Sequence, residues 1–249
     1  MKRHLSIFML FIRSTFYRVL VVLGLLAVTE TGLVYVTLER FLAESAQGAE
    51  KNYALSELIK EAGLIWVFVI AFVLITVILC MFGCDFRGKL EYTLQRLGVS
   101  PVKIFFWQAA CNALTYVIFW MVQVYLVFGF GMYYMKAADP SWVTNQTLFL
   151  EFYRSRFLFS IFPMEDVGIW VTNVCLVLCL GIVTARVPHA QRRGKPSVGF
   201  FAVMLIVGTL LWQGWGLFEN AAVALVLLLI VTGMTLAFVG LTEPGLDEE

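Results

Sequence analysis

A single carboxylate interrupts the first of several long apolar stretches in this 249-residue chain. Glu30 lies within residues 19–38, and it is the only Asp, Glu, Lys, Arg or His in any of the six apolar stretches described below. An ionised carboxylate in hydrocarbon costs at least a few kcal/mol, so we expect Glu30 to face a helix-bundle interior, a partner or water. Two interpretations stay open. Glu30 is a polar or proton-sensitive point on a translocation path, or its helix starts nearer Ser14 and Glu30 approaches the outer lipid headgroups.

A second candidate for chemistry is the charged segment 85–97, which separates two apolar stretches. Asp85 can cap the start of a helix, and Gly98 can end it. Between them an apolar stripe recurs at helical spacing, formed by Phe86, Leu90, Leu94 and Leu97. Charged and amide side chains lie off the stripe: Arg87, Lys89, Glu91, Gln95 and Arg96. The pattern predicts an amphipathic helix of about 20 Å, either docked on a partner or lying in the membrane interface.

The sequence offers no catalytic or metal-binding motif. Its five cysteines stand at 80, 84, 111, 175 and 179, within or at the edge of apolar stretches, and the two histidines, His4 and His189, lie elsewhere along the chain. These cysteines are typical of small apolar packing residues. The phosphate-binding pattern of ATPases is also absent. We therefore expect no metal, no cofactor and no enzymatic activity in this chain itself.

The composition identifies the elements that must position these residues. Hydrophobic residues make up 61% of the chain, charged residues make up 14%, and the mean hydropathy is +0.86. A helix of about 20 apolar residues crosses a bilayer, and the uninterrupted stretches exclude an alternating barrel pattern. The sequence predicts one all-α integral membrane domain over residues 1–249. Its six transmembrane helices are expected at 19–38, 62–82, 104–131, 167–185, 198–215 and 221–241.

Several shorter segments accompany these spans. Residues 1–18 mix basic and apolar side chains, which favours a helix in the lipid interface. Residues 147–162 are rich in Phe and predict an outer interfacial segment. The Gly233-x-x-x-Ala237 pattern permits close helix approach. Uncharged polar residues inside the spans are expected to bind neighbouring helices together; they are Gln108, Asn112, Gln123, Asn173 and Gln213.

Lys and Arg are distributed unequally between the two predicted faces of the membrane. Twelve of these basic residues lie on the side that carries both termini, and six lie on the opposite side. Because basic residues concentrate on the cytoplasmic side, both termini are predicted to be cytoplasmic in a multi-pass protein of the cell membrane.

The sequence Phe-Arg-Gly-Lys-Leu-Glu-Tyr-Thr-Leu-Gln-Arg-Leu-Gly-Val-Ser, residues 86–100, resembles the segment between the second and third spans of ABC-2-type ABC transporter permeases. In that family a short coupling helix docks in a groove of a separate ATPase subunit, which binds ATP and Mg²⁺. The resemblance implies that residues 85–97 form this coupling helix. Its implied contacts with the ATPase are Arg87, Lys89, Leu90, Glu91, Tyr92, Leu94, Gln95, Arg96 and Leu97.

The resemblance further implies a bacterial permease that pairs with a second, identical or paralogous protomer and exports a peptide, lipid or drug. Membrane lipids are expected partners, and nucleic acid is not. One departure from the family is that the connection 216–220 is too short for an outer hairpin between the fifth and sixth spans. Two alternatives stay open: a six-helix substrate-binding component of a vitamin importer, and an intramembrane enzyme.

Overall fold

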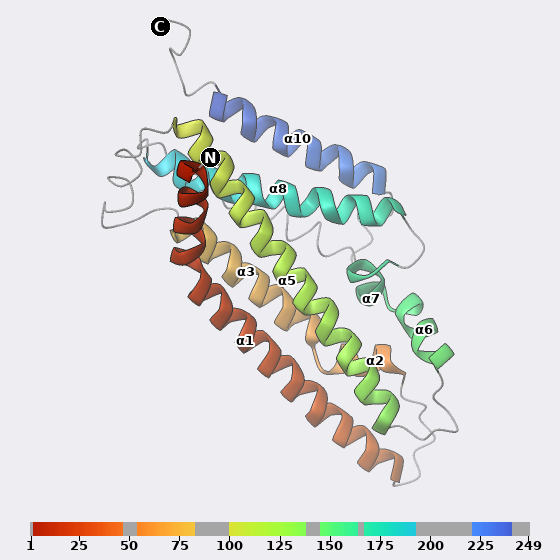
Figure 1. Ribbon diagram of the computed structural model, residues 1–249. Helices are drawn as coiled ribbons and strands as arrows, with labels where there is room; N and C mark the ends of the chain where they lie inside the picture. Colours follow the sequence, from red (N-terminus) through yellow and green to blue (C-terminus); the bar gives the residue numbers. More distant parts are fainter. Residues whose placement is uncertain are drawn as a thin grey trace, which may run out of the picture. The chain divides into compact units, whose positions relative to one another are not determined.

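Every regular element that the computed structural model describes is an α-helix (Figure 1). The model describes residues 2–46, 54–82, 100–137, 145–163, 167–192 and 221–240. The helices are α1 (Lys2–Ala46), α2 (Leu55–Glu61), α3 (Leu64–Phe82), α5 (Pro101–Ala137), α6 (Asn145–Arg154), α7 (Arg156–Ile161), α8 (Val167–Arg192) and α10 (Ala221–Gly240). The expected all-α class is confirmed for this part of the chain.

Four of these helices are long and apolar enough to cross a membrane. They supply the candidate spans Phe8–Glu44, Leu64–Met81, Pro101–Ala137 and Val167–Ala190. Helix α10 has 20 residues and contains a shorter apolar stretch, Leu228–Ala237. The predicted span 198–215 and the predicted coupling helix 85–97 lie outside the described residues.

Helix α1 joins two segments that the sequence analysis separated. It runs from Lys2 to Ala46 without a break at residue 18, and its candidate span begins at Phe8. The chain has no proline before residue 101 and no glycine before Gly24, so nothing in this stretch ends a helix. The basic residues Arg13 and Arg18 are exposed on it and do not interrupt it.

A glycine separates α2 from α3. Gly63 has a φ of +66°, which side chains with a Cβ rarely adopt. The preceding helix closes with Ala62 N–H donating to Leu58 O at 2.9 Å and Gly63 N–H donating to Lys60 O at 3.2 Å. The second span was predicted from residue 62, and α3 begins two residues later because this turn redirects the chain.

Helices α5 and α8 both exceed their predicted lengths. Helix α5 begins at Pro101, where the Ser100-Pro101 pair predicts a start, and it continues past residue 131 to Ala137. Helix α8 continues past residue 185 to Arg192 and includes Pro188. The predicted outer segment 147–162 forms two short helices, α6 and α7, separated by the extended residue Ser155.

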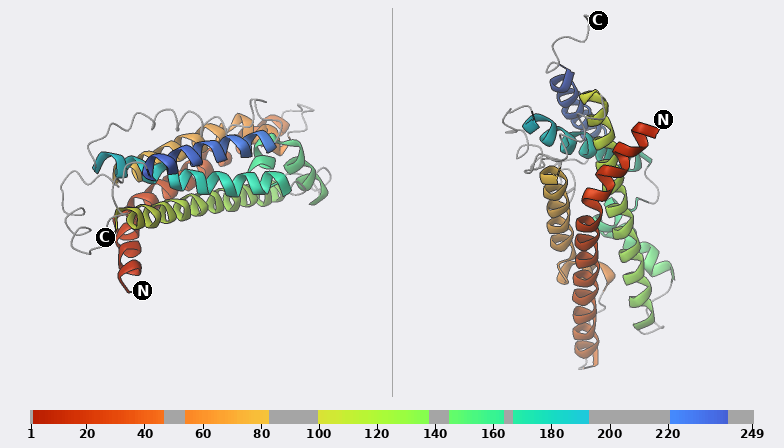
Figure 2. Two further views of the ribbon diagram at one scale, coloured as in Figure 1. Left: turned by 90° about the horizontal axis from the view of Figure 1, so that it is seen from above. Right: turned by 60° about the vertical axis from the view of Figure 1, so that its left-hand side comes forward.

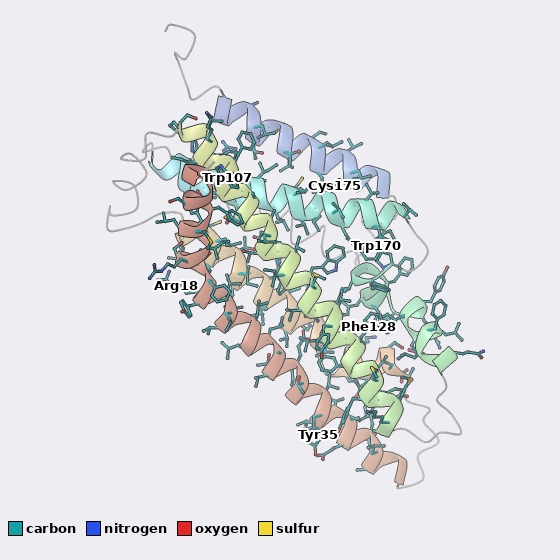
Figure 3. All side chains as sticks on the ribbon, in the orientation of Figure 1. Arg18, Tyr35, Trp107, Phe128, Trp170 and Cys175 are labelled. Atoms are coloured by element: carbon teal, nitrogen blue, oxygen red, sulfur yellow. The ribbon has the colours of Figure 1, made fainter. Side chains whose placement is uncertain are left out.

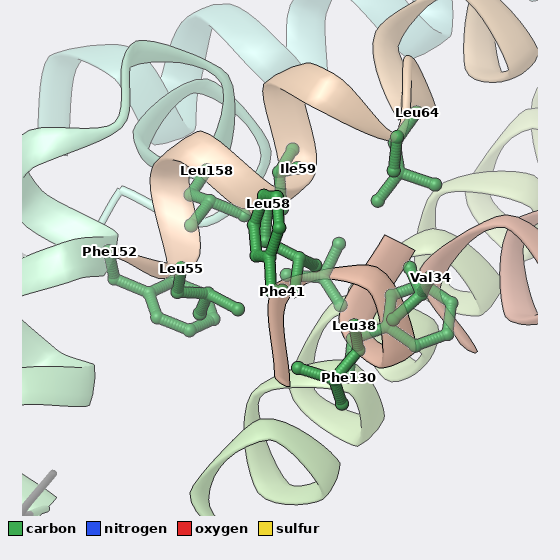
Figure 4. Close-up of a cluster of buried hydrophobic side chains, with 12 residues drawn as sticks. Val34, Leu38, Phe41, Leu55, Leu58, Ile59, Leu64, Phe130, Phe152 and Leu158 are labelled. Carbon is green, nitrogen blue, oxygen red and sulfur yellow. The ribbon is translucent and has the colours of Figure 1, made fainter. Parts of the chain in front are cut away.

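The chain divides into two compact units, which α1, α3 and α5 each enter. One comprises residues 20–73 and 119–167. Its centre is an apolar cluster to which α1, α2, α3, α5, α6 and α7 contribute (Figure 4). The cluster consists of Val34, Leu38, Phe41, Leu55, Leu58, Ile59, Ala62, Leu64, Val127, Phe130, Phe152 and Leu158.

Aromatic contacts attach α6 and α7 to α5 within this unit. Phe128 of α5 stacks on Phe152 at a centroid distance of 5.0 Å and meets Phe162 edge-on at 5.4 Å (Figure 3). Trp120 Nε1 donates to Ile161 O at 2.9 Å. Such contacts bury large apolar surfaces and fix ring orientation.

The other unit contains residues 1–19, 74–118 and 168–249. Helix α10 lies beside α8 in it (Figures 1 and 2), and Cys179 Sγ of α8 contacts Leu228 O of α10 at 3.4 Å. The start of α1 packs on α5, where Phe8 meets Trp107 edge-on at a centroid distance of 5.7 Å.

Candidate functional site

Glu30 lies on the buried face of α1. Buried residues recur there at four-residue spacing, at Val22, Leu26, Glu30, Val34 and Leu38. This spacing keeps successive side chains on one face of a helix. Packing of the four aliphatic side chains therefore carries the carboxylate inward, and Glu30 has 0% of its surface exposed.

The partner of Glu30 is Gln123 of α5. Gln123 is also 0% exposed, and it occupies a stripe with Phe119, Val127 and Phe130. Its Nε2 amide donates to both carboxylate oxygens of Glu30, at 3.0 Å to Oε1 and 3.1 Å to Oε2. Glu30 thus faces a partner helix, as the cost of exposing it to lipid requires.

Apolar packing surrounds the pair along both helices. Val34 on α1 and Val127 on α5, each one turn beyond the pair, belong to the apolar cluster of Figure 4. No basic side chain hydrogen bonds to Glu30 among the residues the structure describes. Gln123 Oε1 is buried as well, and it has no hydrogen-bond partner within that same part of the chain. The site combines a carboxyl group, one amide donor and one unmatched acceptor among buried apolar side chains.

A second group of polar contacts lies in the other unit. Asn112 Nδ2 donates to Thr184 Oγ1 at 3.0 Å, and Tyr116 Oη donates to Thr76 Oγ1 at 2.9 Å. The first contact binds α5 to α8, and the second binds α5 to α3. These are neutral hydrogen bonds between helices, the role predicted for Asn112.

Helices α5 and α8 approach each other closely at Gly181. A Cβ at this position would lie 2.7 Å from Ala109 O and 2.7 Å from Ala113 Cβ. By contrast, a Cβ at Gly233, which the sequence analysis singled out, would meet no described atom within 4 Å. The sequence analysis missed Gly181, although Gly181-x-x-x-Ala185 is the same small-residue pattern as Gly233-x-x-x-Ala237.

A long-range contact also supports the short helix α2. Its N-cap residue is Ala54, which has no side-chain acceptor. Ser56 N–H, one of the free amides at the start of the helix, instead donates to Glu151 Oε2 of α6 at 3.0 Å. The residue spacing gave no signal for this pair, which 95 positions separate.

The remaining predicted site residues lie elsewhere. All the implied ATPase contacts, from Arg87 to Leu97, fall outside the described residues. Over the part that is described, no three His, Cys, Asp or Glu side chains gather to hold a metal ion. Glu30 is therefore the one predicted site residue whose surroundings the structure gives.

Comparison with models of known protein families, with curated protein sequences and with solved structures finds no match to this chain.

Proposed function

We propose that this chain is the membrane-spanning permease subunit of an ABC-2-type ABC transporter, and that it works as an exporter. Separate cytoplasmic ATPase subunits bind ATP and Mg²⁺ and drive movement of a peptide, lipid or drug. The permease acts with a second protomer, identical or paralogous. In this proposal it has six spans, with residues 198–215 and α10 added to the four candidate spans, and both termini are in the cytoplasm of a bacterial cell.

The observation that carries the proposal is the position of the charged segment. Helix α3 ends at Phe82 and α5 begins at Pro101, and each is apolar and long enough to cross a membrane. Residues 83–100 therefore connect two crossings at one membrane face. This is where an amphipathic helix can receive force from a partner outside the bilayer. Its apolar stripe would anchor the contact, and its charged rim would orient it.

The buried polar contacts are compatible with a helix bundle that changes its packing. Glu30 with Gln123, and Asn112 with Thr184, join helices by one or two hydrogen bonds inside apolar surroundings. Hydrogen bonds of this kind between membrane helices contribute about 0.6–2 kcal/mol each, small enough to be exchanged during a transport cycle.

Purification of the tagged, full-length chain in mild detergent tests the proposal. We expect an ABC ATPase subunit to copurify with it. The Leu94→Asp variant places a charge on the apolar stripe and should lose that subunit while the permease itself is recovered. The Gly88→Asp variant adds the same charge on the side of the helix opposite the stripe, at a residue that is not an implied ATPase contact, and should retain the subunit.

Other results identify the alternatives. A chain that copurifies with a retained small molecule but no ATPase subunit would indicate the substrate-binding component of an importer. Chemical turnover by the purified chain alone would indicate an intramembrane enzyme. Either result would overturn the permease assignment.

A further inference from the structure

We propose that Glu30 is a proton-binding site, and that the bound proton converts its contact with Gln123 into a cyclic pair of a carboxylic acid and an amide. This inference concerns the chemistry of the pair and does not depend on the proposed transport function.

The proposal follows from the donors and acceptors in the site. An ionised carboxylate can only accept hydrogen bonds, and a carboxamide supplies one acceptor oxygen and one NH₂ group. Gln123 Nε2 already serves both oxygens of Glu30, at 3.0 and 3.1 Å. Gln123 Oε1 is left as a buried acceptor with no partner among the described residues. The two carboxyl oxygens therefore share one NH₂ group, the amide oxygen has no donor, and the site lacks one hydrogen.

One proton on Glu30 supplies that hydrogen. The neutral acid donates its hydroxyl hydrogen to Gln123 Oε1, while Gln123 Nε2 donates to the remaining carboxyl oxygen. The change needs only rotation about terminal torsions that join sp³ to sp² carbons, which are broad and soft. The amide oxygen of Gln123 then has a donor, which removes the cost of a buried unpaired acceptor.

The packing favours a proton over a larger cation. Glu30 and Gln123 are both 0% exposed, so an ion with volume would have to displace the neighbouring side chains. A proton needs no space. It also cancels a charge that apolar surroundings oppose, and buried acids commonly neutralise for this reason.

Charged groups on the neighbouring helices are too distant along their axes to replace the proton. On α1 the basic residues on either side of Glu30 are Arg18 and Arg40, at least ten residues away, or about 15 Å of helix. Both are exposed. Helix α3 carries no Asp, Glu, Lys, Arg or His. On α5 the charged residues are Lys103 and Lys136, both exposed and near the helix ends.

No other titratable group of the same unit hydrogen bonds to the Glu30 carboxyl group among the described residues. Tyr125 of α5 and the acidic and basic residues of α2 are exposed, and Glu151 of α6 accepts the hydrogen bond from Ser56. Entry of water between α1 and α5 would hydrate Glu30 and favour release of its proton. The bound proton in this way stabilises the contact between two candidate spans.

Infrared difference spectroscopy on the purified full-length protein in lipid tests the inference at neutral pH. We expect a carbonyl band of a protonated carboxylic acid that shifts in D₂O. The band should be lost in Glu30→Gln and retained in Glu39→Gln, which removes an exposed carboxylate from the same helix. In Gln123→Leu it should persist and move to higher frequency, because the carbonyl loses its hydrogen-bond donor.

A hydrophobic carbodiimide, which reacts with protonated carboxyl groups in apolar surroundings, provides a second readout. Mass spectrometry of the digested protein should find the adduct on Glu30, and Glu30→Gln should lose it. If no protonated-acid band or adduct can be assigned to Glu30, the carboxylate is ionised in the folded protein and the inference is overturned. An unshifted band in Gln123→Leu would overturn the cyclic pair. Neither measurement requires an ATPase or a cargo, so its failure is distinct from failure of the permease assignment.

Discussion

Glu30 and Gln123 are each a polar side chain within an apolar, buried stripe of a helix. Each is buried because the aliphatic and aromatic neighbours one turn away on its own helix are buried. The two side chains then have little choice of partner, since the alternative is an unsatisfied polar group in a dry interior. Removing one member should therefore cost more than removing both.

Replacing Gln123 with Leu should destabilise the protein by about 1–3 kcal/mol, because it leaves the carboxyl group of Glu30 buried without a partner. The Glu30→Leu/Gln123→Leu double variant should recover most of that loss, because no buried polar group then lacks a partner. Unfolding of the purified protein in detergent by heat or denaturant measures both effects. Met121→Leu on the exposed face of α5 is the control. Equal stability of Gln123→Leu and the unchanged protein would contradict this account.

For this contact, the sequence predicts the inward position of Glu30 but not the identity of its partner. The cost of a charge in hydrocarbon predicts that Glu30 faces inward, which it does. The sequence analysis did not identify Gln123 as the partner among its five uncharged polar residues. The pair is 93 positions apart, and its register depends on how whole helix faces pack.

Among the elements, α5 has described contacts with α1, α3, α6 and α8. Its Asn112 bonds to Thr184 of α8, its Ala109 and Ala113 lie against Gly181 of α8, and its Tyr116 bonds to Thr76 of α3. Small side chains at Ala109 and Ala113 allow the backbone of α8 to approach closely. Membrane helices gain stability from such van der Waals contact because lipid supplies little hydrophobic driving force between helices.

Gly181→Ala should lower stability by about 1–3 kcal/mol, because the added methyl group meets the backbone oxygen of Ala109 and the helices must separate. The melting temperature of the purified protein in detergent is the measurement. Gly129→Ala is a matched control within α5, where a Cβ would meet no described atom within 4 Å. That variant should be neutral or stabilising by up to about 1 kcal/mol, because alanine favours a helix. A Gly181→Ala variant as stable as the control would show that the two helices are not in close contact.

Element boundaries followed local signals where these were strong. The Ser100-Pro101 pair predicts the observed start of α5, and the absence of proline and glycine explains why α1 continues through residue 18. Hydropathy predicts only the apolar part of a helix. It therefore does not predict that α5 and α8 extend beyond their apolar stretches. A helix continues until its backbone hydrogen bonds are interrupted.

At the scale of the whole molecule, every regular element in the described residues is a helix, and four of these helices contain candidate spans. The proposed function adds a requirement that acts over the full length of the protein. Work done on residues 85–97 must reach the spans through α3 and α5, the two helices attached to that segment. A change in its apolar stripe should therefore affect coupling more than folding.

In membranes that contain the permease and its proposed ATPase, Leu94→Asp or Leu97→Asp should separate ATP hydrolysis from transport. The charge opposes docking of an apolar ridge in a groove of the ATPase. Cargo uptake into inverted vesicles and ATP hydrolysis are measured together, with Gly88→Asp as the control and the amount of permease in the membrane held equal. Normal export by the Leu94→Asp protein would refute the coupling role of this segment.

The hydrogen bond from Ser56 to Glu151 has a consequence for biosynthesis. Ribosomes add about 5–20 residues per second, so the acceptor for this amide is made roughly 5–20 s after the amide itself. Throughout that interval the nascent α2 has neither its own cap nor the aromatic side chains of α6 and α7 to cover it. Completion of the packing around α2 must therefore wait for late-made residues, and a chain truncated before Glu151 would lack both the hydrogen bond from Ser56 and the contacts of α2 with α6 and α7.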